Sequence, residues 1–447
     1  MAQIFYGRKQ KVCTVVDKKC LCVFFQSSYF SSVDIKSMKR FLLSSFLSII
    51  FVSFIHSPSG LYGEVFEFKY KQGDTYRILT KVEEDVIMNG VYSHHAKIVN
   101  RVSIEVTGVN EDGSGVHNAS FMASDESNSS NGKHFSWGNT YKSTYTRAKN
   151  GVFTISDELF MPVIRNLPIF PEGDVKKGEK WTANGYEAED LRRAFKMDKP
   201  YIVPFSAQYT YIGPQVQNDG RTLHEVRVSY NIYYDSPSPQ GSLAKQDYPA
   251  QTMGHSEQTL FFDAEKGALD HYSEKFRIVI DTSWGNRYDF RGSSESVVQD
   301  FVRTADEKTV ESVKDIVENL NIENVKVTAG ENGLTISLEN IKFYPDSDKL
   351  LESEMSKIEM IAEVVKRYPN NDLLITGHTA RAGSVESQDK LSVERAEAVA
   401  ELFIEMGVKE REHIFTKGMG SRSPVAPSDT EENKARNRRV EITILDK

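Results

Sequence analysis

The chain has 447 residues, of which 39% are hydrophobic and 26% charged, and its formal net charge at pH 7 is −8. This length exceeds one ordinary domain, so we expect two to three domains of roughly 100–200 residues each. The three cysteines, Cys13, Cys20 and Cys22, all lie near the start of the chain. Disulfides and thiolate metal ligands are therefore excluded from the rest of the sequence.

Residues 1–63 have the character of a leader segment. A Met-Lys-Arg triplet begins at Met38 and a short apolar run follows, which together give the charged n-region and the h-region of a secretory signal peptide. We predict that the signal peptide covers residues 38–63, with cleavage near Gly63, and that residues 1–37 are an over-extended start or an unusually long n-region. The apolar run is short for a membrane span, so we expect no transmembrane segment after signal removal; a retained membrane anchor is the alternative.

The leader is basic, whereas the rest of the chain is acidic. Residues 1–63 hold 8 Lys and Arg against 2 Asp and Glu, so removal of the leader takes the formal charge from −8 to −14. Because nucleic-acid binding depends on a basic surface, the acidic mature chain argues against nucleic acid as a partner.

From residue 64 to about residue 293 the sequence follows a period of two, with turn residues between the apolar runs. Apolar side chains alternate with polar or charged ones in the segments 76–82, 102–106, 226–234 and 276–280. This pattern is typical of half-buried antiparallel strands. Prolines and glycines interrupt the alternation between Met161 and Gly178, so we predict two β-rich modules, 64–165 and 166–293.

The β-rich region shows no residue spacing that points to catalysis. His94 and His95 are adjacent, so on a strand they would face opposite sides and could not easily bind one metal ion. We identify no carboxylate pair, no nucleophile with a base and no metal set, and we predict no enzymatic activity, cofactor or metal site. Aromatic residues here are expected to belong to the core or to cross-strand pairs rather than to a ligand groove. The aromatic residues in question are Trp181, Tyr209, Tyr211, Tyr233, Tyr234 and Trp284.

After the β-rich region the pattern changes to strands that alternate with helices. Residues 294–305 are predicted to form a helical linker, because valines recur there at helical spacing. In the domain 306–447 the predicted elements are, in order, a helix to 320, a hairpin of 325–328 and 334–338, a helix at 348–367, a strand at 373–376, a helix at 392–406, and strands at 413–418 and 439–445. Such alternation around a small sheet indicates an α/β sandwich. The predicted fold class is therefore α+β and multi-domain, with two antiparallel β-rich modules ahead of the sandwich.

Five motifs in the C-terminal domain resemble those of a known family. They are Ile341-Lys-Phe-Tyr-Pro-Asp-Ser347, Gly377-His-Thr379 with Gly383-Ser384, Leu391-Ser392-x-x-Arg395-Ala396-x-x-Val399, Gly418-Met-Gly420 with Pro424-Val-Ala426, and Asn437-Arg-Arg-Val-Glu-Ile442. In this order and spacing the motifs are specific, and residues 306–447 are similar to the OmpA-like peptidoglycan-binding domain. The resemblance does not extend to residues 64–293.

The resemblance implies non-covalent attachment to the cell wall. Members of the family bind the diamino acid of the peptidoglycan stem peptide: an aspartate takes its ammonium group and an arginine takes a carboxylate. Arg395 occupies the arginine position, which suits the role because the planar guanidinium matches a carboxylate. Thr379 and Asn437 fall where the family lines the pocket. Arg438 lies close to them in sequence.

At the aspartate position the chain departs from the family and has Ala380. Loss of a charge-assisted hydrogen bond costs roughly 1.5–3 kcal/mol, so we expect stem-peptide binding to be weakened or lost. Glu386 and Asp389 are close enough in sequence to substitute for the missing carboxylate.

Two further features bear on the arginine. Gln388 stands where the family has an asparagine before Leu391. In the alternative interpretation of Arg395, its guanidinium pairs with a local carboxylate, Glu394 or Glu397, and only holds the helix.

The sequence thus favours a secreted, non-enzymatic protein of the periplasm, associated with the outer membrane or the cell wall. Its expected partners are peptidoglycan, bound weakly or no longer bound, and other envelope proteins. The alternative is an envelope scaffold that binds a protein, lipid or glycan through its β-rich modules and reuses the OmpA-like fold.

Overall fold

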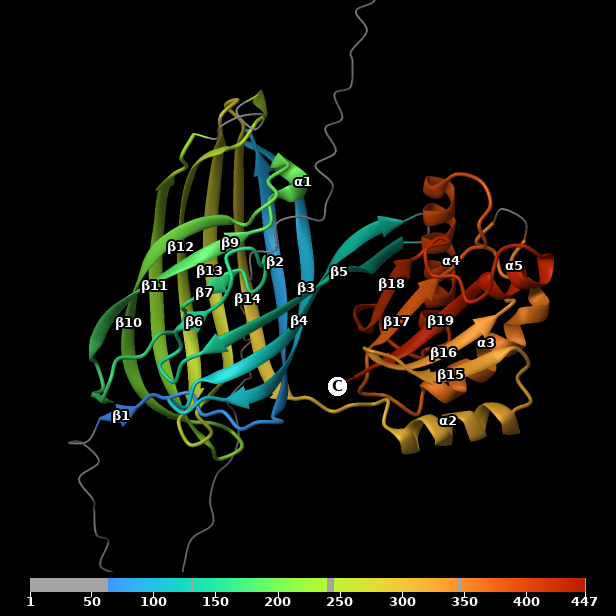
Figure 1. Ribbon diagram of the computed structural model, residues 1–447, viewed down its shortest axis with the longest axis horizontal. Coiled ribbons are helices and arrows are strands. Elements are labelled where there is room, and N and C mark those ends of the chain that lie inside the picture. The colour runs from blue at the N-terminus through green and yellow to red at the C-terminus, as the bar shows by residue number, and fades with distance from the viewer. Residues whose placement is uncertain (1–62, 130–131, 239–244, 345–346, 447) are drawn as a thin grey trace, which may run out of the picture.

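The computed structural model describes residues 63–129, 132–238, 245–344 and 347–446 (Figure 1). The predicted signal peptide and the residues before it lie outside the described residues. None of the described helices combines the length and the apolar character needed to cross a membrane.

Long antiparallel strands between residues 75 and 300 form one curled sheet, seen on the left of Figure 1. In the order in which they pair, the strands are β9 (Lys180–Glu189), β10 (Tyr201–Val216), β11 (Thr222–Asp235), β12 (Pro249–Asp263), β13 (Ala268–Thr282), β14 (Arg287–Asp300), β2 (Thr75–Met88), β3 (Val91–Val109), β4 (Gly115–Ser129) and β5 (Gly132–Arg147). Short elements complete this part: β1 (Glu64–Val65) with β8 (Asp174–Val175), β6 (Phe153–Thr154), β7 (Ile164–Arg165) and α1 (Arg192–Phe195).

The predicted boundary between modules 64–165 and 166–293 does not separate two sheets. β2, from the first predicted module, pairs along its whole length with β14, which closes the second. β14 and β2 are therefore neighbours in one sheet although about 200 residues separate them in the chain. The proline-rich segment 161–178 instead connects β5 to β9, which lie at opposite ends of the strand order. The prediction of two β-rich modules is therefore wrong, because both contribute strands to one curled sheet.

The predicted helical linker at 294–305 is also wrong. Residues 294–300 continue strand β14, and the first helix of the C-terminal part, α2, covers only Glu307–Asn319. Ser294 and Ser296 are fully buried in the sheet interior, whereas Val297 is 49% exposed. In a half-buried strand the inward positions are usually apolar and the outward ones polar, and here the serines face inward and Val297 faces outward. The apolar residues of this segment therefore did not show the period of a strand.

The C-terminal part contains the alternating elements that the sequence predicts. They are β15 (Val325–Ala329), β16 (Gly333–Glu339), α3 (Glu352–Val365), β17 (Leu373–Gly377), α4 (Val385–Glu405), the 3₁₀ turn η2 (Arg411–His413), β18 (Ile414–Gly418), α5 (Glu431–Asn437) and β19 (Arg439–Leu445). The sheet order is β18-β17-β19-β16-β15. Helices α2, α3 and α4 pack their apolar faces on one side of this sheet and form a single core with it. Among the described residues of this part, the short helix α5 and the 3₁₀ turn η2 were not predicted from the sequence.

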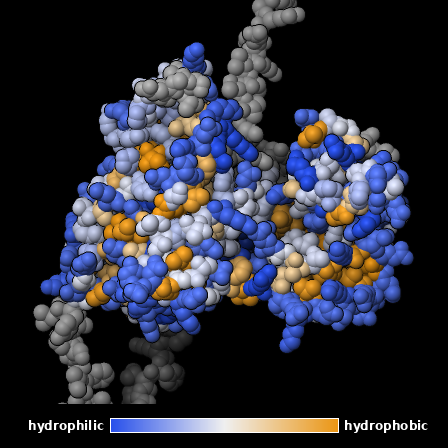
Figure 2. Space-filling model, in the orientation of Figure 1, coloured by the Kyte–Doolittle hydropathy of each residue, from blue (hydrophilic) through white to orange (hydrophobic). Residues whose placement is uncertain are grey.

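Side chains alternate between the two faces of the curled sheet, apart from register shifts such as those at Val86/Ile87 and Tyr211/Gly213. Outward positions carry charges, for example Asp85, Arg227 and Lys275, which are exposed. Figure 2 shows this face covered mainly by hydrophilic residues, with hydrophobic ones in small separate patches. Inward positions are mostly apolar and aromatic, but they also include a group of buried carboxyl side chains. These buried glutamates are Glu84, Glu187, Glu189 and Glu274.

The outer surface of β3, β4 and β5 docks against the second face of the C-terminal sheet. We call this contact the docking seam. It is formed by Val99, Met122, Phe135 and Trp137 from the curled sheet and Leu374, Phe415 and Leu445 from the C-terminal sheet. β5 also pairs in parallel with β18, at Phe135 and Phe415, so the two sheets join through backbone hydrogen bonds as well.

A buried ion pair lies within the docking seam. Arg101, on β3, pairs with Asp372, which precedes β17, and its guanidinium lies 5.1 Å from the centre of the Phe415 ring. Burial lowers the pKa of Arg101 to about 9. Asp372 also accepts a hydrogen bond from His413 Nδ1 at 2.7 Å. The carboxylate of Asp372 thus compensates the charge of Arg101, which is buried in the docking seam.

Removal of the Asp372 carboxylate should weaken the seam. In Asp372→Ala, Arg101 would be buried without its partner, which typically costs about 3–5 kcal/mol. We expect the free energy of unfolding, measured by urea titration, to fall by this amount. The matched control is Glu331→Ala, which breaks the ion pair between Lys142 and Glu331 that also joins the two parts of the molecule. Because both of these side chains are about two-thirds exposed, the expected loss of unfolding free energy is below about 1 kcal/mol. Equal losses in the two variants would contradict the assignment.

The buried Glu84 should make stability depend on pH. Burial, with a smaller contribution from Asp85, raises the pKa of Glu84 to about 8. As pH rises from about 4.5 to about 8, the unfolded chain ionises at this residue and the folded chain does not, so stability falls by roughly 1.4 kcal/mol per pH unit. Glu84→Gln should reduce the loss of unfolding free energy between pH 5 and pH 8. Glu83→Gln, at the adjacent outward position, should leave it unchanged; a similar effect of both variants would count against a neutral Glu84.

Candidate functional site

The candidate site lies where β17 ends and the chain turns into α4 (Figure 1). At Gly377 the strand passes so close to α4 that a Cβ there would collide with the backbone carbonyl of Ser392. Ser384 caps the helix, because its Oγ accepts a hydrogen bond from the backbone N–H of Ser387 at 3.1 Å. Gly420, in the neighbouring loop, donates its N–H to Ser392 Oγ at 2.9 Å. These contacts fix α4, and with it Arg395, against the end of the strand.

Arg395 is buried, with 8% of its surface exposed. Its Nε donates to the backbone carbonyl of Ser347 at 3.3 Å, and its guanidinium carbon lies 4.7 Å from the centre of the Phe343 ring. Both contacts come from the Ile341–Ser347 motif, of which Pro345 and Asp346 lie outside the described residues. The aromatic face and the carbonyl hold the guanidinium in place. The sequence analysis did not name Phe343 and Ser347 as site residues, although their motif was the available signal.

Thr379 and Ala380 follow the strand and are both buried. The backbone N–H of Thr379 donates to the carbonyl of Gly420 at 2.9 Å, whereas its Oγ1 is buried with no hydrogen-bond partner among the described residues. Gln388 donates through Nε2 to the carbonyl of Gly383 at 3.1 Å, and its Oε1 is also buried without a described partner. Buried polar atoms are usually hydrogen-bonded, and both of these atoms belong to the segment that runs from β17 into α4.

Asn437 and Arg438 have different surroundings. Asn437 Oδ1 accepts from the backbone N–H groups of Val425 and Ala426, at 2.8 and 3.1 Å, and its Nδ2 donates to the carbonyl of Ala426 at 2.8 Å. The side chain therefore fastens the loop before α5. Arg438 forms an ion pair with Glu431 at 2.8 Å and is partly exposed.

The two carboxylates considered as substitutes are placed differently. Asp389 forms an ion pair with Arg422, whose Nη1 lies 2.6 Å from Asp389 Oδ2. Glu386 is exposed in the first turn of α4. Of the carboxylates named in the alternative interpretation of Arg395, Glu394 pairs with Lys390 at 3.6 Å and Glu397 is buried. Asp389 is thus already engaged, and Glu386 is the candidate that faces solvent.

A buried polar group lies at the base of the site. His378 Nε2 is 3.4 Å from Glu441 Oε2, and Arg439 Nε donates to Glu441 Oε1 at 2.7 Å. Burial lowers the pKa of His378 below its usual value, with Glu441 acting in the opposite direction. Burial by itself would raise the pKa of Glu441, but His378 and Arg439 outweigh it and bring it to about 2. Glu441 is therefore charged at neutral pH, and its hydrogen-bonded partner is Arg439 on the same strand, β19.

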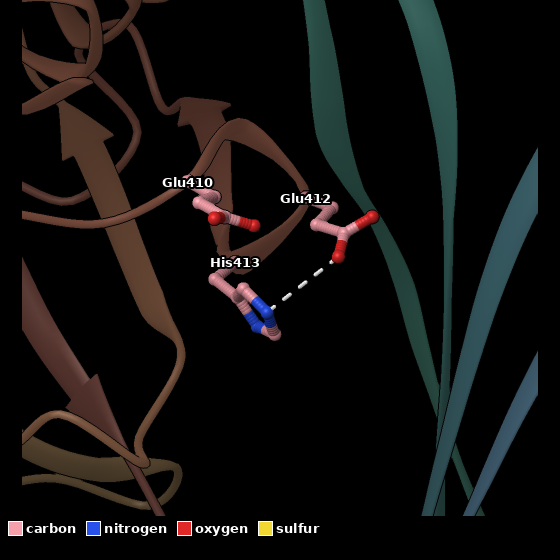
Figure 3. A group of neighbouring side chains, drawn as sticks. All are labelled: Glu410, Glu412 and His413. Atoms are coloured by element: carbon pink, nitrogen blue, oxygen red, sulfur yellow. Dashed lines mark ion pairs between the residues drawn. The ribbon is translucent and has the colours of Figure 1, made fainter. Parts of the chain in front are cut away.

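Among the residues that the structure describes, Glu410, Glu412 and His413 lie close enough to hold a metal ion (Figure 3). All three are exposed. His413 Nδ1 is already hydrogen-bonded to Asp372, and its Nε2 lies 3.7 Å from Glu412. Two of the three side chains, Glu412 and His413, already take part in contacts at the edge of the docking seam.

Residues 342–438 match the model of the OmpA family, and the C-terminal domain belongs to this family. Among curated relatives, "Probable lipoprotein YiaD" of Escherichia coli (strain K12) is 36% identical over 121 residues, which cover 27% of this chain and 55% of the relative. "Peptidoglycan-binding protein ArfA" of Mycobacterium tuberculosis (strain ATCC 25618 / H37Rv) is 36% identical over 104 residues, 23% of this chain and 32% of the relative. The chain thus spans about half or less of the length of these relatives.

Solved structures give matches of similar extent. An outer membrane protein from Borrelia burgdorferi B31 is 38% identical, and the match covers 27% of this chain and 96% of that chain at a TM-score of 0.23. The peptidoglycan-associated lipoprotein from Burkholderia pseudomallei is 27% identical, with 25% and 89% covered and a TM-score of 0.22. At these TM-scores the structural likeness carries no argument, and the family assignment depends on the sequence match.

The role of Asn437 as a loop fastener can be tested. Asn437→Ala would leave the N–H groups of Val425 and Ala426 without their acceptor, which typically costs about 1–3 kcal/mol for each buried group that stays unpaired. We expect a lower melting temperature and faster proteolysis of the loop 424–428. Asn433→Ala, one turn earlier on α5, removes an exposed bond to Asp429 and should have a much smaller effect. A melting temperature unchanged by Asn437→Ala would disprove the role.

Proposed function

We propose that the protein is a secreted, non-enzymatic protein of the cell envelope, which resides in the periplasm and associates with peptidoglycan through its OmpA-family domain. In this proposal the signal peptide at 38–63 directs export, and the site beside β17 takes the end of a stem peptide. The affinity is low, because the guanidinium of Arg395 pairs with a carboxylate of the stem peptide whereas Ala380 has no group that can bind the ammonium group of the peptide.

The single observation that carries this proposal is the fixed position of Arg395. Its guanidinium is held between Phe343 and the carbonyl of Ser347 and lies on the helix that Gly377 brings against the strand end. A prepositioned guanidinium loses little freedom when it binds a carboxylate. The buried, unpartnered Oγ1 of Thr379 and Oε1 of Gln388 support a polar ligand at the same loop. The relatives named for peptidoglycan binding are consistent with this ligand class.

Ala380 defines the weak half of the proposed site. Its methyl group cannot accept a hydrogen bond, and Asp389, one of the two nearby candidates for a replacement, is engaged with Arg422. Glu386 is exposed and would have to reach over the loop. We therefore assign the ligand ammonium to solvent, where it keeps its hydration and contributes little to affinity.

A second candidate function is that of an envelope scaffold that binds its partner through the curled sheet and reuses the OmpA fold. The docking seam favours this candidate, since it ties the curled sheet firmly to the C-terminal domain. The two functions are compatible, because the seam involves the sheet face opposite the helices and leaves the loop after β17 to the peptidoglycan site.

Restoring the missing carboxylate should strengthen binding. We expect Ala380→Asp to raise the affinity of the full chain for a soluble stem peptide that ends in a diamino acid by about tenfold to hundredfold, because it adds one charge-assisted hydrogen bond. Isothermal titration measures this change directly. If Ala380→Asp folds normally but leaves the affinity unchanged, the proposed orientation of the peptide is wrong.

Removal of the guanidinium should have the opposite effect. Arg395→Met keeps an apolar side chain over Phe343 and should weaken binding at least about tenfold. Arg367→Met serves as the control, because Arg367 is exposed near the opposite end of β17. Loss of binding in both variants, or in neither, would contradict the role of Arg395.

A further inference from the structure

The interior of the curled sheet holds a cavity of about 780 Å³. It is lined by residues of two separate hydrophobic clusters: Phe68 and Leu260 belong to one, and Val102, Phe121 and Val163 to the other. Protein cores are normally packed without voids much larger than a water molecule. The volume falls instead within the range of small-molecule sites. The two clusters are therefore the walls of a chamber rather than halves of one packed core.

The walls of the cavity are largely apolar and aromatic. They come from strands that are consecutive in the strand order, namely β12, β13, β14, β2, β3, β4 and β5, and from the segments that precede β2 and follow β5. The apolar and aromatic lining includes Phe68, Tyr70, Tyr76, Ile78, Val102, Ile104, Phe121, Tyr145, Phe153, Leu260, Leu269, Tyr272 and Val298. Exposed polar residues among the lining, such as Lys69, Asp74 and Lys266, mark the mouth. Such a chamber suits a ligand with a long apolar body.

Arg147, at the end of β5, supplies a positive charge to the cavity wall. Its guanidinium carbon lies 3.9 Å from the centre of the Phe68 ring and 4.8 Å from that of Phe153, and its Nε donates to the carbonyl of Gly151 at 3.4 Å. Within the described parts of the chain, no carboxylate lies within 4 Å of this guanidinium. Arg221, by contrast, is engaged at the mouth with Asp219 at 2.7 Å. Arg147 is thus a cation over aromatic rings that can still take an anion.

Two other polar side chains belong to the cavity lining. Tyr70 is one of them, and its hydroxyl is buried with no hydrogen-bond partner among the described residues. Glu274 also lines the cavity and accepts a hydrogen bond from the hydroxyl of Ser256. Burial raises the pKa of Glu274 well above its usual range, which favours the uncharged form of this carboxyl.

We propose that the cavity binds one single-chain amphiphile, whose apolar chain fills the chamber and whose terminal oxyanion, a carboxylate or a phosphate, pairs with Arg147. This function is additional to the association with peptidoglycan and does not depend on it. The wall also carries the carboxyl groups of Asp74, Asp263, Asp270 and Asp300. The oxyanion is assigned to Arg147 because its guanidinium lies over the rings of Phe68 and Phe153 and, among the described residues, has no carboxylate within 4 Å. A single chain is assigned because the chamber has the volume of one small-molecule site.

The test uses the full chain, stripped of bound lipid, and three probes below their micelle concentrations: hexadecanoate, hexadecanol and a lysophosphatidate with the same chain. We expect both anions to bind with one-to-one stoichiometry and the alcohol at least about tenfold more weakly, because it lacks the charge that Arg147 recognises. A stronger response to the carboxylate or to the phosphate identifies the source of the oxyanion. Equal binding of alcohol and anions would overturn the role of Arg147, and no binding of any probe would overturn the site.

Variants separate the cavity from the rest of the sheet. Arg147→Gln should reduce the affinity for hexadecanoate by about tenfold to hundredfold and leave that for hexadecanol unchanged. Arg227→Gln, on the outward face of β11, should change neither. Val298→Trp fills the chamber and should abolish binding of all probes, whereas Val297→Trp, its outward-facing neighbour on β14, should not. If the two tryptophan variants behave alike while both remain folded, the ligand does not enter the cavity and the proposal fails.

Discussion

The C-terminal site depends on a buried arginine whose position is fixed before any ligand arrives. Burial of a guanidinium is costly unless its hydrogen bonds are satisfied, and here the carbonyl of Ser347 and the ring of Phe343 provide part of that compensation. The close approach of Gly377 to α4 sets the depth at which Arg395 lies. A side chain so held has little rotamer freedom left to lose, so even a one-charge contact with a ligand carboxylate can be productive. In the proposed site, the absence of a carboxylate at Ala380 would then limit the affinity rather than the orientation of the ligand.

The docking seam gives the molecule its second constraint. In the C-terminal sheet one face is covered by helices, and the other packs against β3, β4 and β5 instead of facing solvent. Arg101 and Asp372 place a compensated charge inside this contact. The OmpA-family domain and the curled sheet are consequently held in one arrangement. If the domain associates with peptidoglycan as proposed, the mouth of the chamber lies at a defined place relative to the cell wall.

The sequence predicted the C-terminal elements well, because each strand and helix there has its own apolar period and its own capping or turn residue. The pairing of β2 with β14 joins segments that are far apart in the chain, so no local sequence pattern predicts it. The region was therefore interpreted as two modules. In β14 the buried positions are serines, so the signal that marks a strand face was absent. The cavity was missed for a related reason: aromatic residues at inward positions read as core in sequence, and only the arrangement of both clusters shows the space between them.

For the candidate site, Arg395 and Ala380 were predicted from their motif positions, whereas contacts between distant segments could not be predicted. The side chain of Asn437 accepts hydrogen bonds from the backbone of Val425 and Ala426, and Asp389 forms an ion pair with Arg422. Neither partner choice follows from spacing along the chain. Phe343 belongs to a motif that the sequence showed, but nothing in the sequence indicates that its ring packs against the guanidinium of Arg395.

The claim that the site grips only the carboxylate end of a stem peptide is tested most directly by one comparison on the unmodified chain. The affinity of a stem peptide with a free side-chain ammonium is measured by titration against that of the same peptide acetylated at this nitrogen. With Ala380 in place, the two affinities should agree within about twofold, since an ammonium left in solvent contributes little. A loss of tenfold or more on acetylation would show that another carboxylate of the chain takes the ammonium, and would contradict the account.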